Sequence, residues 1–75
     1  MRRTEKFEEK KRMIVKERGA ECKEMRKSYN LSQQTVAERI GVSQDLISKF
    51  ERGVVDSVSI YCLYVETVLK LRYEN

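Results

Sequence analysis

The sequence lacks histidine, proline and tryptophan, and its 75 residues include only two cysteines and three glycines. Cys22 and Cys62 are too few and too far apart for a structural zinc cluster, and no histidine can complete one. The sequence also has no glycine-rich phosphate loop and no recognisable pair of catalytic carboxylates. We therefore expect no metal, no cofactor, no small-molecule ligand and no enzymatic activity.

Long apolar runs are missing as well. No stretch of about 18 apolar residues could span a bilayer, and the start, MRRTEKFEEKKR, carries charges where a signal peptide needs an apolar region. We expect a cytoplasmic protein with no membrane partner. In that reducing compartment both cysteines should be reduced, and both fall among apolar helix positions. We therefore expect them in the core rather than in a disulfide or a redox switch.

The charge is unevenly placed along the chain. Residues 1–27 hold eleven Lys and Arg against six Glu, whereas residues 28–75 hold five Lys and Arg against six Asp and Glu. The net charges are +5 and −1, which add up to the formal net charge of +4. The basic character therefore belongs to the first third of the chain.

Helix-forming residues dominate, and glycine punctuates them at positions 19, 41 and 53. We expect helices over residues 4–28, 33–40, 44–52 and 57–72. Gly19 either splits the first of these or is tolerated within it at a cost of about 1 kcal/mol. We divide the chain into a basic N-terminal extension, residues 1–18, and a domain spanning residues 19–75.

The stretch from Gln33 to Phe50 has the spacing of two short helices that cross through a tight turn. Ala37 is small enough to lie at the crossing, and Gly41 can adopt the left-handed conformation that ends a helix. Ser43 is a good N-cap for the second helix. Ile47 and Phe50 fall on the inner arc of that helix, so the stretch is typical of a helix-turn-helix.

These residues resemble a known family. The run LSQQTVAERIGVSQDLISKFERG, residues 31–53, is similar to the helix-turn-helix core of the phage-repressor/Cro-type transcriptional regulators. The resemblance extends over roughly residues 20–69. It implies a compact all-α, lambda-repressor-like domain of four or five helices that binds double-stranded DNA. The sequence departs from the family in its N-terminal extension and in lacking a proline at the start of the last helix.

The resemblance also implies which residues meet DNA. On the outer arc of the second motif helix, the side chains that match base-reading positions are Gln44, Asp45 and Lys49, and Ser48 lies near them as a fourth candidate. Gln33 matches a position that binds a phosphate. Further candidates for the DNA backbone are Ser43, Arg52, Lys27 and Ser32.

The last predicted helix carries two apolar stripes. One suits packing in the core and comprises Val58, Tyr61, Cys62, Val65 and either Val68 or Leu69. The other comprises Ile60, Leu63, Tyr64 and Leu71, which we assign to a homodimer interface because an apolar second face indicates a partner. The alternative is a monomer with scattered surface hydrophobic residues.

We thus expect a dimeric transcriptional repressor that reads an inverted-repeat operator. Blocking of a promoter and contact with RNA polymerase both remain open as its mode of action. Two other functions are also open: a protein-interaction module such as an antitoxin or adaptor, and a non-specific architectural DNA binder. The N-terminal third is a solvated helix, a partner-binding helix, or an arm that contacts phosphates through Arg2, Arg3, Lys10, Lys11 and Arg12.

Overall fold

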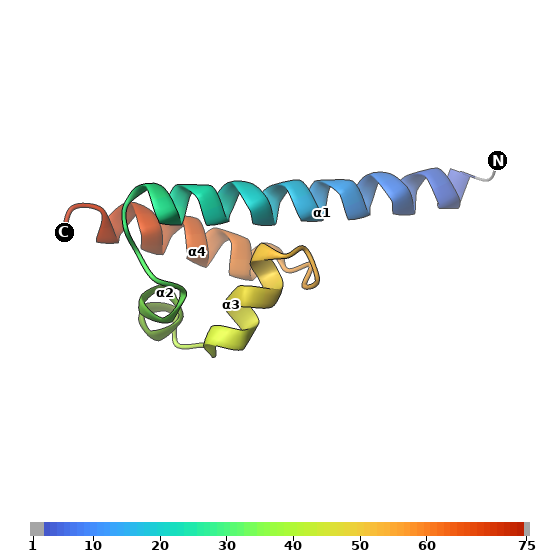
Figure 1. The fold of residues 1–75 in the computed structure, drawn as a ribbon. Helices are drawn as coiled ribbons and strands as arrows, with labels where there is room; N and C mark the ends of the chain where they lie inside the picture. Colours follow the sequence, from blue (N-terminus) through green and yellow to red (C-terminus); the bar gives the residue numbers. More distant parts are fainter. Residues whose placement is uncertain (1–2, 75) are drawn as a thin grey trace.

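The computed structural model describes residues 3–74, and the side chains of residues 6–74. Within this range the chain forms four helices and no strand: α1 (Arg3–Ser28), α2 (Gln33–Ile40), α3 (Gln44–Glu51) and α4 (Val58–Leu71) (Figure 1). The predicted all-α class is confirmed. None of these helices is long and apolar enough to cross a membrane.

Serine hydroxyls begin three of the helices. The Oγ atoms of Ser32, Ser43 and Ser57 accept hydrogen bonds from backbone amides three residues later, at 3.0, 3.1 and 3.2 Å. Each bond satisfies one of the amides that a helix N-terminus leaves unpaired. Ser57 thus starts α4 at the place where the sequence lacks the proline of the family pattern.

Helix α1 continues through Gly19 without a break, so the extension and the first helix of the domain are one element. A Cβ atom at this position would collide with the carbonyl oxygen of Phe50 and lie 2.7 Å from that of Glu51. The glycine therefore lets α1 lie directly against the C-terminal end of α3, and this contact explains why a poor helix former stands inside a long helix.

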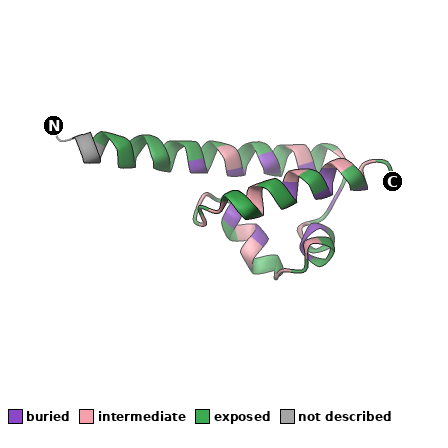
Figure 2. Ribbon diagram, turned by 180° about the vertical axis from the view of Figure 1, so that it is seen from behind, coloured by how far each residue is buried: buried purple, intermediate pink, exposed green. Residues whose placement is uncertain are grey.

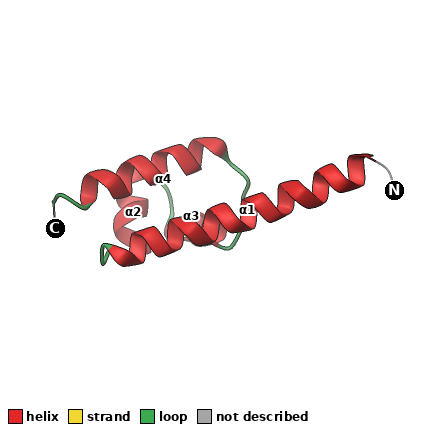
Figure 3. Cartoon of the chain, turned by 90° about the horizontal axis from the view of Figure 1, so that it is seen from above, coloured by secondary structure: helices red, strands yellow, loops and turns green. Residues whose placement is uncertain are grey.

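The core lies between α1 and α4 on one side and α2 and α3 on the other. Viewed from above, α1 and α4 run side by side over the two shorter helices (Figure 3). The largest fully buried side chains are Val36, Ile47, Tyr64 and Val68. In contrast, residues 6–14 are all exposed, and this part of α1 projects beyond the other helices (Figure 2).

The two faces of α4 differ in part from our prediction. Tyr64 and Leu71, which we assigned to a dimer interface, are buried in the core, and Ile60 is half-buried against it. Of the predicted core stripe, Val68 is buried and Tyr61 and Val65 are half-buried against the core, whereas Val58 and Cys62 are exposed. Leu63 is exposed, as a surface residue should be. The helix is thus rotated relative to our prediction, because the Tyr64 hydroxyl is hydrogen-bonded to polar groups inside the core.

The cysteines differ from each other. Both are free thiols, but Cys22 is buried and Cys62 is exposed, so the prediction of two core cysteines is wrong for Cys62. Burial raises the pKa of the Cys22 thiol to about 11, which keeps this thiol uncharged at neutral pH.

Candidate nucleic-acid interface

The turn between α2 and α3 has the geometry that the sequence predicts. Gly41 adopts φ = 91°, in the left-handed region, and the amides of Gly41 and Val42 both donate to the Ala37 carbonyl, at 2.8 and 3.0 Å. No atom lies within 4 Å of a Cβ built on Gly41, so the position requires glycine for its backbone conformation alone. Ala37, Ile47 and Phe50 are all buried.

The outer arc of α3 presents polar side chains to solvent. Gln44, Asp45 and Lys49 are exposed and Ser48 is half-buried. Lys49 Nζ lies 2.9 Å from Asp45 Oδ2, one helical turn away. Because both side chains are exposed, this ion pair is weak. Lys49 can exchange it for a base edge or a phosphate, and Asp45 can exchange it for a base amino group.

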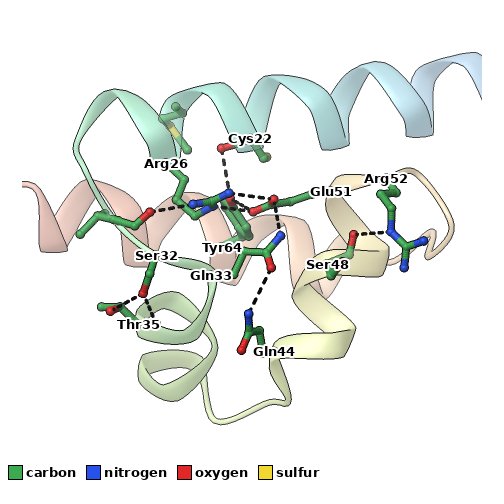
Figure 4. Close-up of polar contacts among 12 residues, drawn as sticks. Cys22, Arg26, Ser32, Gln33, Thr35, Gln44, Ser48, Glu51, Arg52 and Tyr64 are labelled. Carbon is green, nitrogen blue, oxygen red and sulfur yellow. Dashed lines mark hydrogen bonds and ion pairs between the residues drawn. The ribbon is translucent and has the colours of Figure 1, made fainter.

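Gln44 is tied to the interior through Gln33. Its Nε2 donates to Gln33 Oε1 at 3.4 Å, and Gln33 Nε2 donates to Glu51 Oε1 at 3.0 Å (Figure 4). Gln33 is the first residue of α2 and Gln44 is the first residue of α3. The side chains at the starts of both motif helices therefore share one hydrogen-bonded chain.

That chain ends in a buried polar cluster formed by Arg26, Glu51 and Tyr64. Arg26 Nε and Nη2 donate to the two carboxylate oxygens of Glu51, at 2.7 and 3.1 Å, and Arg26 Nη1 donates to the Leu31 carbonyl at 2.7 Å. The Tyr64 hydroxyl lies 2.5 Å from Glu51 Oε2 and 3.1 Å from the Cys22 carbonyl. The cluster therefore joins α1, α3 and α4 to the loop before α2.

These contacts fix the charge state of the cluster. Burial by itself would raise the pKa of Glu51, but the hydrogen bonds from Arg26, Tyr64 and Gln33 outweigh it and leave the pKa below the usual value. Burial and the adjacent carboxylate raise the pKa of Tyr64. Glu51 is therefore ionised and Tyr64 neutral at physiological pH.

The sequence contains a signal for this cluster, which the apolar patterns alone do not reveal. Glu51 follows Ile47 by four residues, and Arg26 follows Cys22 by four, so each charge lies on the buried face of its helix. A charged residue at such a position requires a partner. Tyr64 supplies a hydroxyl to the same pair, which is why its face of α4 turns inward.

The predicted backbone-contacting residues lie on several elements. Ser32 and Ser43 cap α2 and α3, and the Ser32 Oγ is also 2.8 Å from the Thr35 hydroxyl. Arg52 caps the C-terminal end of α3 and its Nε donates to the Ser48 carbonyl at 3.4 Å, while Lys27 is exposed near the end of α1. Gln33, Ser43 and Gln44 thus lie together at the helix starts, whereas Arg52 stands at the other end of α3.

Comparison with known proteins gives a family match over the helix-turn-helix. No curated protein and no solved structure matches the chain significantly. Residues 23–60, just over half of the chain, match the helix-turn-helix family of the Cro/C1 type. The match begins in α1, covers α2 and α3 and ends in α4. The chain therefore belongs to the Cro/C1-type helix-turn-helix family of DNA-binding transcriptional regulators.

Proposed function

We propose that the protein is a sequence-specific repressor that reads an inverted-repeat operator with α3. The observation that carries this proposal is the hydrogen-bonded chain from Gln44 through Gln33 to Glu51. It holds an exposed amide at the start of α3 in a defined position, and a preorganised amide suits the paired donor and acceptor of an adenine edge. Repression would follow when the bound protein blocks a promoter.

Base readout is tested by alanine substitution on the outer arc of α3. Gln44→Ala and Lys49→Ala should each cost about 1–3 kcal/mol on the preferred site and relax preference at one base pair. Lys6→Ala is the control, because Lys6 is an exposed lysine of α1 that lies outside the helix-turn-helix and outside the proposed dimer face. Unchanged preference in both α3 variants would remove the assignment. Asp45 and Ser48 complete the proposed base-reading set.

Contacts to the DNA backbone should behave differently from base contacts. Arg52→Ala should weaken binding to every duplex and reduce the dependence of affinity on salt, because a lost phosphate contact carries no sequence information. Lower affinity for the preferred site alone would show that Arg52 reads bases. Lys27, Ser32, Gln33 and Ser43 are the other proposed backbone contacts. Gln33 would contribute its backbone amide at the start of α2, because its side-chain amino group donates to Glu51.

A half-buried stripe of α4 supports pairing of two copies, and it is not the stripe that we assigned to the dimer. Tyr61, Val65 and Leu69 follow one another at single-turn spacing and line a shallow groove of about 550 Å³. Cys62 lies on the same face, as do Glu66 and Lys70 along one edge. When two copies of α4 pack antiparallel about a two-fold axis, Glu66 of one copy lies opposite Lys70 of the other. These opposite charges favour a symmetric dimer.

Charged substitutions distinguish the two possible interfaces on α4. Cys62→Lys should give a folded monomer with much weaker operator binding, whereas Leu63→Lys, an exposed position outside the groove, should leave the dimer intact. Dissociation by Leu63→Lys alone would place the interface outside the groove. Sedimentation showing that the unmodified protein is a monomer at high concentration would refute the dimer.

Selection of bound sequences from a random duplex pool tests the proposed function as a whole. A repressor of this kind should select an inverted repeat whose half-sites lie one helical turn apart, about 34 Å. Equal recovery of unrelated duplexes would indicate an architectural binder. Failure to recover any duplex, together with a co-purifying protein, would indicate an adaptor or antitoxin.

A further inference from the structure

Between positions 12 and 27, the exposed charges of α1 are segregated around the helix. At about 100° per residue, four basic residues fall within an arc of roughly 60° on one flank, and all are exposed: Arg12, Lys16, Lys23 and Lys27. Between positions 12 and 27 the acidic residues lie on another side of the helix: Glu17, Glu21 and Glu24. Glu9 marks the end of the basic flank, which we define as the four basic residues named.

Contacts with the turn after α3 place this flank on the α3 side of the molecule. A Cβ atom on Gly53 would lie 2.7 Å from Lys16 Cγ and 2.8 Å from Lys16 Cα, so the turn packs directly on the helix at Lys16. Arg12 and Gly53 line one small cavity of about 350 Å³. Arg12 and Lys16 therefore flank Gly53, the residue that follows Arg52. This turn follows the end of α3 that lies nearest to α1 (Figure 1).

The basic flank is not neutralised within the protein. The ion pairs among residues 6–74 are Lys11–Asp56, Arg26–Glu51, Arg39–Glu74, Lys49–Asp45 and Lys70–Glu66, and none involves the basic flank. None joins two residues of α1 either. The described part of α1 therefore does not form the internal ion pairs that we expected of a solvated helix.

We propose that the basic flank of α1 is a second DNA-binding surface, which holds the sugar-phosphate backbone beyond the bases read by α3. The inference rests on the proposed function, because it takes the duplex bound at α3 as its ligand. Arg12 and Lys27 are fifteen residues apart, or about 22 Å along a helix, so the flank can follow a phosphate strand over several base pairs. Contacts of this kind add affinity and fix position without adding sequence preference.

This surface differs from the arm that the sequence suggested. Lys11 forms an ion pair with Asp56 at 3.7 Å, and Lys10 lines a groove on the other side of the helix with Phe7 and Ile14. Arg2 lies outside the described residues, as does the side chain of Arg3. Of the five residues of the predicted arm, Arg12 alone belongs to the basic flank.

Two matched double variants test the proposal. Arg12→Gln/Lys16→Gln removes two charges from the basic flank, and Lys6→Gln/Lys10→Gln removes two exposed charges from another side of the same helix. Glutamine keeps the stem that contacts Gly53 and is a good helix former. Circular dichroism should show the same helix content and similar thermal unfolding for both.

Binding of the full chain to its selected duplex and to an unrelated duplex is then measured from 0.05 to 0.3 M salt. Loss of two phosphate contacts should lower the slope of log affinity against log salt by about 1.8 and lower the affinity roughly 60-fold at 0.1 M salt, on both duplexes. The control variant Lys6→Gln/Lys10→Gln should leave the salt slope nearly unchanged and should alter the affinity only by a small factor. Base preference should be the same in all three proteins.

The possible failures are distinguishable. Equal losses of DNA affinity in the two double variants would mean that net charge determines binding rather than the position of the basic flank. Unchanged DNA binding by Arg12→Gln/Lys16→Gln would also overturn the proposal. Unchanged DNA binding with loss of a co-purifying protein would assign the flank to a protein partner. If the unmodified protein itself binds no duplex, the proposed function fails first. If Gln44→Ala weakens DNA binding but Arg12→Gln/Lys16→Gln does not, the proposed function stands and only the role of the basic flank is overturned.

Discussion

The two halves of α1 have similar compositions but different surroundings. In the N-terminal half, Phe7, Met13 and Ile14 are 65%, 61% and 51% exposed, and no residue from 6 to 14 is buried. In the C-terminal half, Val15, Gly19, Cys22 and Arg26 are buried against α3 and α4. Apolar residues at helical spacing therefore do not by themselves mark a core face.

The difference between the halves comes from two residues that would be poor choices in an isolated helix. Gly19 weakens a helix, and Arg26 is costly to bury. Here, Gly19 allows contact with the end of α3, and Arg26 forms the ion pair with Glu51. The N-terminal half carries no such residue facing α3, and the other helices do not extend along it. Substitutions can test how far the two halves differ.

The largest effect should come from breaking the buried ion pair. Glu51→Gln leaves the Arg26 guanidinium buried at 8% exposure without its counter-charge, so the free energy of unfolding should fall by about 3–5 kcal/mol. Urea denaturation measures the loss. Glu74→Gln, which breaks the exposed pair with Arg39, should cost much less, because water screens an exposed ion pair. Equal effects of the two would show that the packed half does not depend on Glu51.

Acid provides a second measure of the same ion pair. The pKa of folded Glu51 lies below its ordinary value of 4.5, so the unfolded chain takes up the proton first. The contribution of this carboxylate is complete above about pH 4.5 and is lost as the pH falls through the folded pKa. Wild-type stability should therefore fall more steeply between pH 5 and 3 than that of Glu51→Gln. Parallel curves would contradict the assigned charge state.

A smaller loss is expected from Gly19→Ala. Alanine normally stabilises a helix by about 0.5–1 kcal/mol relative to glycine, but a methyl group here meets the Phe50 and Glu51 carbonyl oxygens. We expect a net destabilisation of about 1–3 kcal/mol, measured by thermal or urea unfolding. The neighbouring exposed residue is the control: Ala20→Gly should lose only the ordinary helix preference. Stabilisation by Gly19→Ala would show that α1 and α3 are not in close contact.

The smallest changes in stability are expected from two neighbouring residues at the boundary between the halves of α1. Val15→Ala removes two buried methyl groups and should cost about 1.5 kcal/mol. Ile14→Ala removes apolar surface that is half exposed and should change stability by less than about 0.5 kcal/mol. Chemical denaturation of both variants is sufficient. Similar losses would mean that the N-terminal half is packed in solution.

Local signals in the sequence were sufficient to predict the helices. Ser32, Ser43 and Ser57 mark three helix starts, and Gly41 marks the turn, because caps and left-handed glycines act over a few residues. The faces of α4 could not be predicted in this way, since both of its stripes are apolar. The inner face depends on Tyr64 reaching Glu51 and Cys22, residues 13 and 42 positions away. The DNA contacts remain predictions.

The buried carboxylate also dictates which atoms the surface offers. An ionised Glu51 can only accept hydrogen bonds, so Gln33 must turn its amino group inward and its carbonyl oxygen outward. That oxygen in turn holds the amino group of Gln44, which leaves the Gln44 carbonyl oxygen and a second amide hydrogen facing the solvent. A negative charge in the interior thereby sets the donor and acceptor order at the start of α3, two side chains away. A core substitution that reversed this order could change the preferred base without altering any residue that touches DNA.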